Sequence, residues 1–142
     1  MKKILLAYDG SEMAKKALQA ARRIGLQDES EIIVLTVAAQ FNFVDLDTGG
    51  KRYMDEAFKA VHEMSKKILD SASKEFADYP FKVNYIDKMG GPGDEIVTYA
   101  NEHDIDLIVM GSRGLGAIKR TFLGSVSNYV LNHTEKSVYI VK

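Results

Sequence analysis

The chain has 142 residues, of which 46% are hydrophobic and 27% are charged, and its formal net charge is -1. This balance gives no electrostatic signal for nucleic acid or for an anionic membrane, so we expect neither as a partner. The chain contains no cysteine, which excludes disulfides, thiolate metal sites and cysteine nucleophiles.

Short apolar runs recur along the chain and predict five β-strands. Most of them are nearly continuous in aliphatic residues, which is typical of strands covered on both faces in a parallel sheet. The third run alternates more between apolar and polar residues, as an outer strand does. The predicted strands are Lys3 to Tyr8, Glu31 to Val37, Phe81 to Ile86, Asp106 to Met110 and Ser137 to Val141.

The stretches between these runs have helical periodicity. Ser11 is a suitable N-cap for the first helix, and Gly25 is expected to be its C-cap. The second helix is predicted over about Arg52 to Phe76, where apolar residues form one stripe. The third helix is expected to begin near Pro92 and the fourth near Gly124. The apolar residues of the fourth helix are Val126, Val130 and Leu131.

The alternation of strands and helices predicts an α/β fold, with a doubly wound parallel sheet and helices on both faces. We expect residues 1–142 to form one domain. Ligands of such sheets bind beyond the carboxyl ends of the strands, where the strand order reverses. The segments after Tyr8, Val37 and Met110 are therefore the candidates for a site. The irregular stretch from Ala38 to Lys51 is expected to be a loop beside it.

No apolar run is long enough to span a membrane, and Asp9 ends the first run too early for a signal peptide. We therefore expect a cytoplasmic protein. His62, His103 and His133 lack the spacing of a metal site and are expected on the surface.

The segment from Gly111 to Ser125 is glycine-rich and leads into the fourth predicted helix. Glycines let backbone N–H groups approach phosphate oxygens, and a helix that starts at Gly124 would direct its positive end toward an anion. The sequence therefore predicts phosphate binding, although tight turns alone are the alternative explanation. The segment is neither a Walker-type P-loop nor a Rossmann fingerprint. Hydroxyl or cationic groups nearby come from Arg113, Lys119, Arg120, Ser125 and Ser127.

Asp9 follows the first strand and precedes Gly10 and Ser11. Its carboxylate has two interpretations, which stay open: a structural turn or cap, and a contact with the ribose or with a Mg²⁺ ion bound to the nucleotide. Ala7 and Val37, at strand ends, are expected to be core residues, with an adenine pocket as the alternative.

Several segments resemble the universal stress protein family. The resemblance begins with Ile4 to Ser11, continues in Gly91 to Ile96 and Asp106 to Gly111, and covers essentially the whole chain. The family's ATP motif consists of a glycine, two residues, a glycine, nine residues, a glycine, and then serine or threonine. It is matched by Gly111, Gly114, Gly124 and Ser125.

This resemblance implies a five-stranded parallel sheet of order 3-2-1-4-5, usually in a homodimer, and it places the chain in the family's ATP-binding branch. It implies adenine contacts around Ala7, Val37 and Met110, and a place for Asp9 near the ribose and phosphates, where it could hold Mg²⁺ indirectly. The residues implied to surround the ribose and phosphates are Gly111, Arg113, Gly114, Gly124, Ser125 and Val126.

The function predicted is that of an ATP-binding, nucleotide-responsive stress regulator with an unidentified regulatory partner. No residue resembles a general base for fast turnover, so at most slow ATP hydrolysis is expected. The alternatives are a genuine ATPase or phosphotransferase that uses the same pocket, and a module that binds another anion or dinucleotide. The last strand, through Val138 to Val141, could be an exposed sheet edge, which invites pairing with a second copy. The resemblance implies dimerisation at this strand, and a simple buried strand is the alternative.

Overall fold

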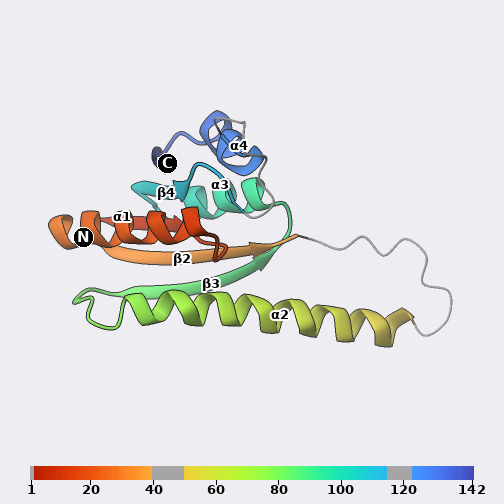
Figure 1. Cartoon of the computed structure of the whole chain (residues 1–142). Helices are drawn as coiled ribbons and strands as arrows, with labels where there is room; N and C mark the ends of the chain where they lie inside the picture. The colour runs from red at the N-terminus through yellow and green to blue at the C-terminus, as the bar shows by residue number, and fades with distance from the viewer. Residues whose placement is uncertain (1, 40–49, 115–122) are drawn as a thin grey trace.

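Five parallel strands form one sheet in the order β3-β2-β1-β4-β5, which is the predicted order (Figure 1). The computed structural model of the chain describes residues 2–39, 50–114 and 123–142. In chain order, the elements are β1 (Lys3–Ala7), α1 (Glu12–Asp28), β2 (Glu31–Ala38), α2 (Gly50–Glu75), β3 (Val83–Met89), α3 (Pro92–Glu102), β4 (Leu107–Gly111), α4 (Ser125–His133) and β5 (Ser137–Val141).

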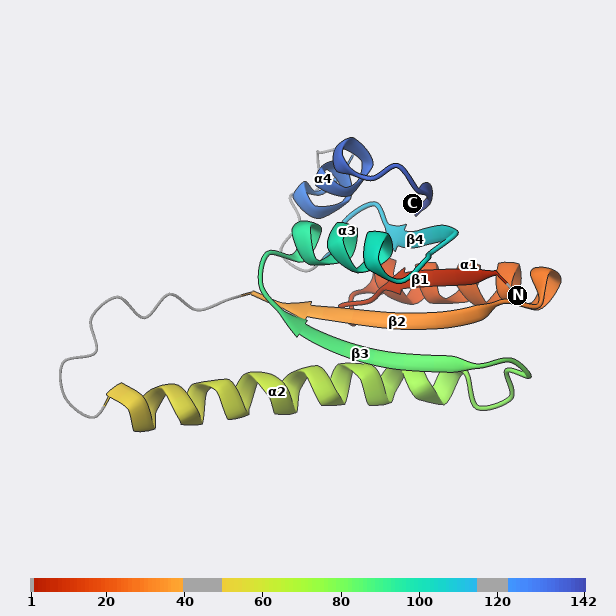
Figure 2. The same cartoon turned by 180° about the vertical axis from the view of Figure 1, so that it is seen from behind.

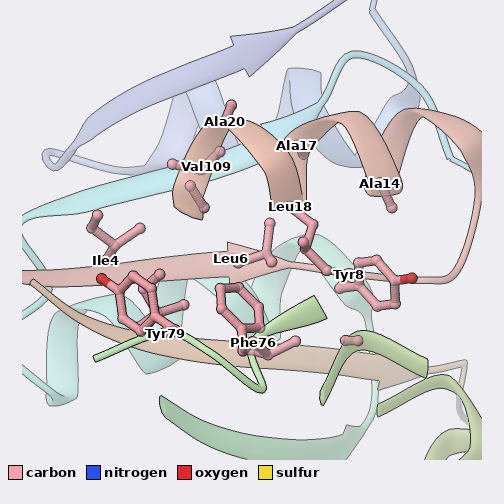
Figure 3. Close-up of a cluster of buried hydrophobic side chains, with 14 of the residues drawn as sticks. Ile4, Leu6, Tyr8, Ala14, Ala17, Leu18, Ala20, Phe76, Tyr79 and Val109 are labelled. Atoms are coloured by element: carbon pink, nitrogen blue, oxygen red, sulfur yellow. The ribbon is translucent and has the colours of Figure 1, made fainter. Parts of the chain in front are cut away.

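The sheet is covered by helices on both faces, as Figures 1 and 2 show from opposite sides. Side chains of β1 and β2 alternate between the two faces, so Leu6 packs with α1 and α2 while Leu5 packs with α3 and α4. Figure 3 shows part of the first cluster, which includes Leu6 of β1, Leu18 of α1 and Phe76, the residue after α2. This double burial accounts for the nearly continuous aliphatic runs of the central strands.

The order of the strands reverses between β1 and β4. The register places Ile4 beside Leu107 and Leu6 beside Val109, so the carboxyl ends of the two strands lie next to each other. From β1 the chain continues through α1 on one face, whereas β4 is reached through α3 on the other face. This is the position at which doubly wound sheets bind their ligands.

The start of α1 is confirmed, but its predicted end is wrong. Ser11 is the N-cap, and its hydroxyl oxygen accepts a hydrogen bond from the Ala14 N–H at 3.1 Å. The helix continues past Gly25 to Asp28, and Glu29 takes the left-handed conformation that was expected of a glycine. Gly25 is instead buried against Tyr79. A Cβ at this position would overlap the Tyr79 hydroxyl, so the close packing requires glycine here.

The outer strand β3 differs from its prediction at both ends. It begins at Val83, two residues later than expected, and continues through Asp87 and Lys88 to Met89. Asp87 and Lys88 are exposed but pair with Thr36 and Val37 of β2. Polar residues on an edge strand give no hydrophobic signal, so the sequence pattern ended too early.

The apolar residues Leu131 and Val130 of α4 differ in their burial. Leu131 is 41% exposed, whereas Val130 is completely buried in the core. The buried residues of this helix are Ser127 and Val130, so only a narrow face of it meets the core. Within the described ranges, no helix is long and apolar enough to cross a membrane.

Candidate functional site

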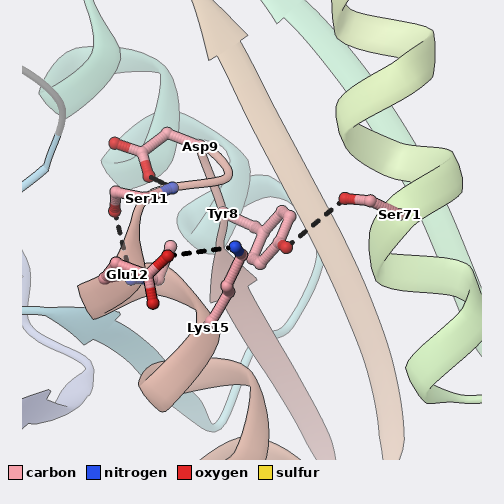
Figure 4. Close-up of polar contacts among 7 residues, drawn as sticks. Tyr8, Asp9, Ser11, Glu12, Lys15 and Ser71 are labelled. Atoms are coloured by element: carbon pink, nitrogen blue, oxygen red, sulfur yellow. Dashed lines mark hydrogen bonds and ion pairs between the residues drawn. The ribbon is translucent and has the colours of Figure 1, made fainter.

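A turn after β1 fixes the carboxylate of Asp9 at the carboxyl edge of the sheet. Asp9 Oδ1 accepts a hydrogen bond from the Ser11 N–H at 2.9 Å, and Gly10 between them has a φ of 81° (Figure 4). The structural role considered for Asp9 is therefore present, as an Asx turn that leads into α1. Only one of its two carboxylate oxygens takes part in this bond.

The second carboxylate oxygen of Asp9 points toward the loop after β4. It lies 2.6 Å from the place that a Cβ on Gly114 would occupy. A side chain at Gly114 would therefore displace the carboxylate. The fold thus brings together Asp9 and a glycine of the predicted phosphate motif, which are more than 100 residues apart in the sequence.

The other two motif glycines have different neighbours. A Cβ on Gly111 would stand 2.8 Å from the Cβ of Met13 in α1, so close packing between β4 and α1 requires this glycine. A Cβ on Gly124 would meet its nearest atoms, in Arg113 and Ser112, only at 3.4 Å, which is ordinary contact. Packing therefore does not require glycine at position 124.

The amino end of α4 lies at this edge of the sheet. Gly124 is the N-cap, and it provides no side-chain hydrogen bond to the first turn. Ser125 and Val126 are the first residues of the helix, and Ser125 is exposed. Backbone N–H groups in a first turn, together with the positive end of the helix dipole, favour an anion.

Ser112 and Ser127 join the two ends of the motif, and neither was assigned this role from the sequence. The Ser112 carbonyl oxygen accepts hydrogen bonds from the Gly124 N–H at 2.6 Å and from the Ser127 hydroxyl at 2.8 Å. The hydroxyl of Ser127, predicted as a phosphate donor, thus donates inside the protein. The sequence offered one indication of the role of Ser112: it is a polar residue between Gly111, the last residue of β4, and Gly114.

The apolar site residues gather on one face of the same edge. Ala7, Val37 and Val126 are partly buried and pack against the core cluster under α3 and α4, and Met110 belongs to that cluster. Met110 is only 4% exposed, so it offers little surface to a ligand. The partly exposed Ala7, Val37 and Val126 could line a pocket for a flat apolar ring.

Some predicted residues lie outside this description. Lys119 and Arg120 are beyond the described residues, as is most of the stretch from Ala38 to Lys51. In the part of the chain that is described, no cluster of three or more histidine and acidic residues could hold a metal ion.

The histidines lie on the surface, as expected. His62, His103 and His133 are exposed. His62 contacts Asp87 at 2.8 Å, while His103 stacks on Tyr99 and His133 stacks on Tyr129. None of the three is near Asp9 among the contacts described.

Comparison with known proteins agrees with this architecture. The universal stress protein family model matches residues 1–142. The chain is 33% identical to the universal stress protein YxiE of Bacillus subtilis, over 99% of this chain and 98% of the relative. It is 31% identical to the universal stress protein MJ0577 of Methanocaldococcus jannaschii, over 99% of this chain and 94% of the relative.

Solved structures show the same fold. The structure of MJ0577 matches with a TM-score of 0.88 and covers 99% of this chain and 95% of that chain. A universal stress protein in complex with cAMP matches with a TM-score of 0.73 at 25% identity, and the match covers 99% of this chain and 97% of that chain. The matched family model, the identity to these relatives and the shared fold show that this chain belongs to the universal stress protein family.

Proposed function

We propose that the chain binds ATP at the carboxyl edge between β1 and β4 and acts as a nucleotide-responsive stress regulator in the cytoplasm. The observation that carries this proposal is the approach of Asp9 to Gly114 beside the amino end of α4. This arrangement offers backbone donors to phosphates and one carboxylate to a sugar hydroxyl or a cation. The cAMP complex of a relative supports a nucleotide as the class of ligand.

In the proposed complex, the phosphates lie against Gly114, Gly124 and the first turn of α4. Arg113 belongs to the same cluster, because its Cα is 3.4 Å from the place of a Cβ on Gly124. The adenine ring lies toward Ala7 and Val37, which pack against the core beneath α3 and α4. Met110 supports this wall from within the core.

A Mg²⁺ ion fits this site only together with a nucleotide. Mg²⁺ is usually held by one or two carboxylates and by substrate phosphates, and Asp9 directs one oxygen toward Gly114. The ion would neutralise phosphate charge, while the Asx turn keeps the Asp9 carboxylate in place. The other carboxylate oxygen accepts the Ser11 N–H, which fixes the orientation of the carboxylate toward a ligand.

The exposed edge strand β5 supports a homodimer as the assembly. Tyr139 is 41% exposed, and a hollow of about 940 Å³ beside it is lined by Arg23, Leu26 and Ile140 among others. A second copy would cover this edge and its apolar side chains.

Identification of the bound ligand tests the proposal directly. Freshly purified protein is denatured, the released small molecules are identified by mass spectrometry, and the melting temperature is measured with and without Mg-ATP. We expect an adenine nucleotide and a higher melting temperature with Mg-ATP. The proposal is wrong if no nucleotide is released and ATP leaves the melting temperature unchanged. Rapid Mg²⁺-dependent turnover that Asp9→Ala abolishes would favour the enzyme instead.

A further inference from the structure

The carbonyl oxygen of Ser112 is the point at which both ends of the glycine motif meet. It accepts one hydrogen bond from the Gly124 N–H at 2.6 Å and a second from the Ser127 hydroxyl at 2.8 Å. The Ser127 oxygen is also 3.1 Å from the Gly124 carbonyl oxygen, so the shorter distance makes Ser112 its main acceptor. We call Ser112, Gly124 and Ser127 the staple.

The staple is built from buried groups. Ser112 and Ser127 are each 2% exposed, although both lie within a polar segment at the edge of the sheet. Hydrogen bonds between buried groups are costly to break, because the groups left behind have no water to replace the lost partner. The staple is therefore a firm connection and not a surface contact.

The staple is also anchored to the sheet. The Ser112 N–H donates to the Val141 carbonyl oxygen of β5 at 2.7 Å, directly after the pairing of Gly111 with Val141. Ser112 thus extends the ladder between β4 and β5 by one residue while its carbonyl holds α4. The first turn of α4 is fixed relative to the strands that carry the rest of the site.

We propose that Ser127 is a positioning residue for nucleotide binding, which acts by holding the first turn of α4 at Ser112 in the orientation that the phosphates require. This inference rests on the proposed function. Ser127 does not touch the ligand in this account, because its hydroxyl is engaged with Ser112. Its loss would leave only one of the two donors described for the Ser112 carbonyl oxygen, the Gly124 N–H, and would let the amino end of α4 shift. Such a shift weakens contacts that depend on the precise position of N–H groups.

The test compares ATP with adenosine, which lacks phosphates, in Ser127→Ala and Ser127→Thr variants. Ser127→Ala should weaken ATP binding about fivefold to tenfold, as the loss of one buried hydrogen bond would, and change adenosine binding by less than about twofold. Ser127→Thr keeps the hydroxyl and should restore most of the ATP affinity. The affinity for ATP is measured by calorimetric titration. The affinity for adenosine is measured from its competition with ATP in the same titration, at a temperature where all variants are folded.

Ser73→Ala is the matched control. The Ser73 hydroxyl donates to the carbonyl of Asp70, three residues earlier in α2, at 2.7 Å, which resembles the Ser127 contact with Gly124 but has no link to the motif. It should leave both affinities unchanged. The inference is wrong if Ser127→Ala binds ATP like the wild type, if ATP and adenosine weaken equally, or if Ser127→Thr fails to recover.

Amide hydrogen exchange separates this inference from the proposed function. Without nucleotide, Ser127→Ala should speed exchange at the Gly124 N–H, because the staple loses one of its bonds. Unchanged exchange at Gly124 would count against the staple even if ATP binds. A wild-type protein that binds no nucleotide would instead refute the proposed function, and the positioning role with it.

Discussion

The motif glycines Gly111 and Gly124 differ in how much space surrounds them, and therefore in why glycine occupies each position. Gly111 is pressed against α1, where an added Cβ would approach the Met13 Cβ to 2.8 Å. Gly124 has a φ of -69°, which any residue adopts, and its nearest neighbours leave room for a methyl group. Packing accounts for Gly111, whereas the proposed approach of a ligand would account for Gly124.

Alanine substitutions separate these two reasons. Gly111→Ala should lower the free energy of unfolding by about 1–3 kcal/mol, because it overpacks the contact between β4 and α1. Gly124→Ala should cost less than about 1 kcal/mol, as a change of N-cap does. Urea denaturation without nucleotide measures both values. Equal losses at the two positions would contradict the assignment.

At the scale of elements, the carboxyl half of α1 is held by Tyr79. The Tyr79 hydroxyl donates to the Ser30 carbonyl oxygen at 2.6 Å, and its ring packs edge to face with Phe76 and Phe81. Burial raises the pKa of the Tyr79 phenol above its ordinary value. Gly25 gives this ring room, and the left-handed turn at Glu29 then ends the helix.

Two substitutions test this explanation of the end of α1. Gly25→Ala should destabilise the protein by about 1–3 kcal/mol, because the methyl group displaces the Tyr79 hydroxyl. Glu29→Gly should stabilise it by about 0.5–1 kcal/mol, since glycine adopts a φ of 51° without strain. Thermal and urea unfolding measure both changes. A neutral Gly25→Ala would contradict the close approach of the Tyr79 hydroxyl to Gly25.

Local patterns predicted the elements but not the contacts between them. The aliphatic runs of β1, β2 and β4 predicted strands because double burial leaves a clear signal, and Ser11 predicted a helix start because its role is local. The end of β3 and the role of Gly25 depend on partners distant in the sequence, Thr36 and Tyr79. Likewise, the motif residues could be predicted, whereas the Ser112–Ser127 staple required the positions of β4 and α4 in space.

At the scale of the whole molecule, the sheet has two edges of different kinds. β3 is accompanied by α2, which lies along it in both views (Figures 1 and 2). The other edge is β5, which pairs with β4 and carries the exposed Tyr139. Ser112 contacts the end of β5, so the proposed nucleotide site and the proposed dimer contact share a strand. A regulator that responds to nucleotide could use this connection.

A charge at position 139 tests the dimer contact. Tyr139→Lys should leave the fold intact, because the side chain is exposed, and should weaken the dimer, because it puts a charge on the proposed contact edge of each copy. Light scattering during size-exclusion chromatography measures the mass. We expect the wild type at twice the chain mass and the variant shifted toward the monomer. A wild-type protein that is monomeric at high concentration would refute the proposed assembly.

The most direct measurement is a calorimetric titration of Mg-ATP into the wild type and into Gly124→Val and Gly91→Val. Both glycines are N-caps with extended backbone, of α4 and α3 respectively, but only Gly124 belongs to the proposed phosphate site. ATP should bind one site per chain in the wild type and in Gly91→Val, and binding should be at least about tenfold weaker in Gly124→Val, whose circular dichroism should stay native. Equal affinity in all three proteins, or no binding in the wild type, would contradict the proposal that ATP binds at Gly124 and the first turn of α4.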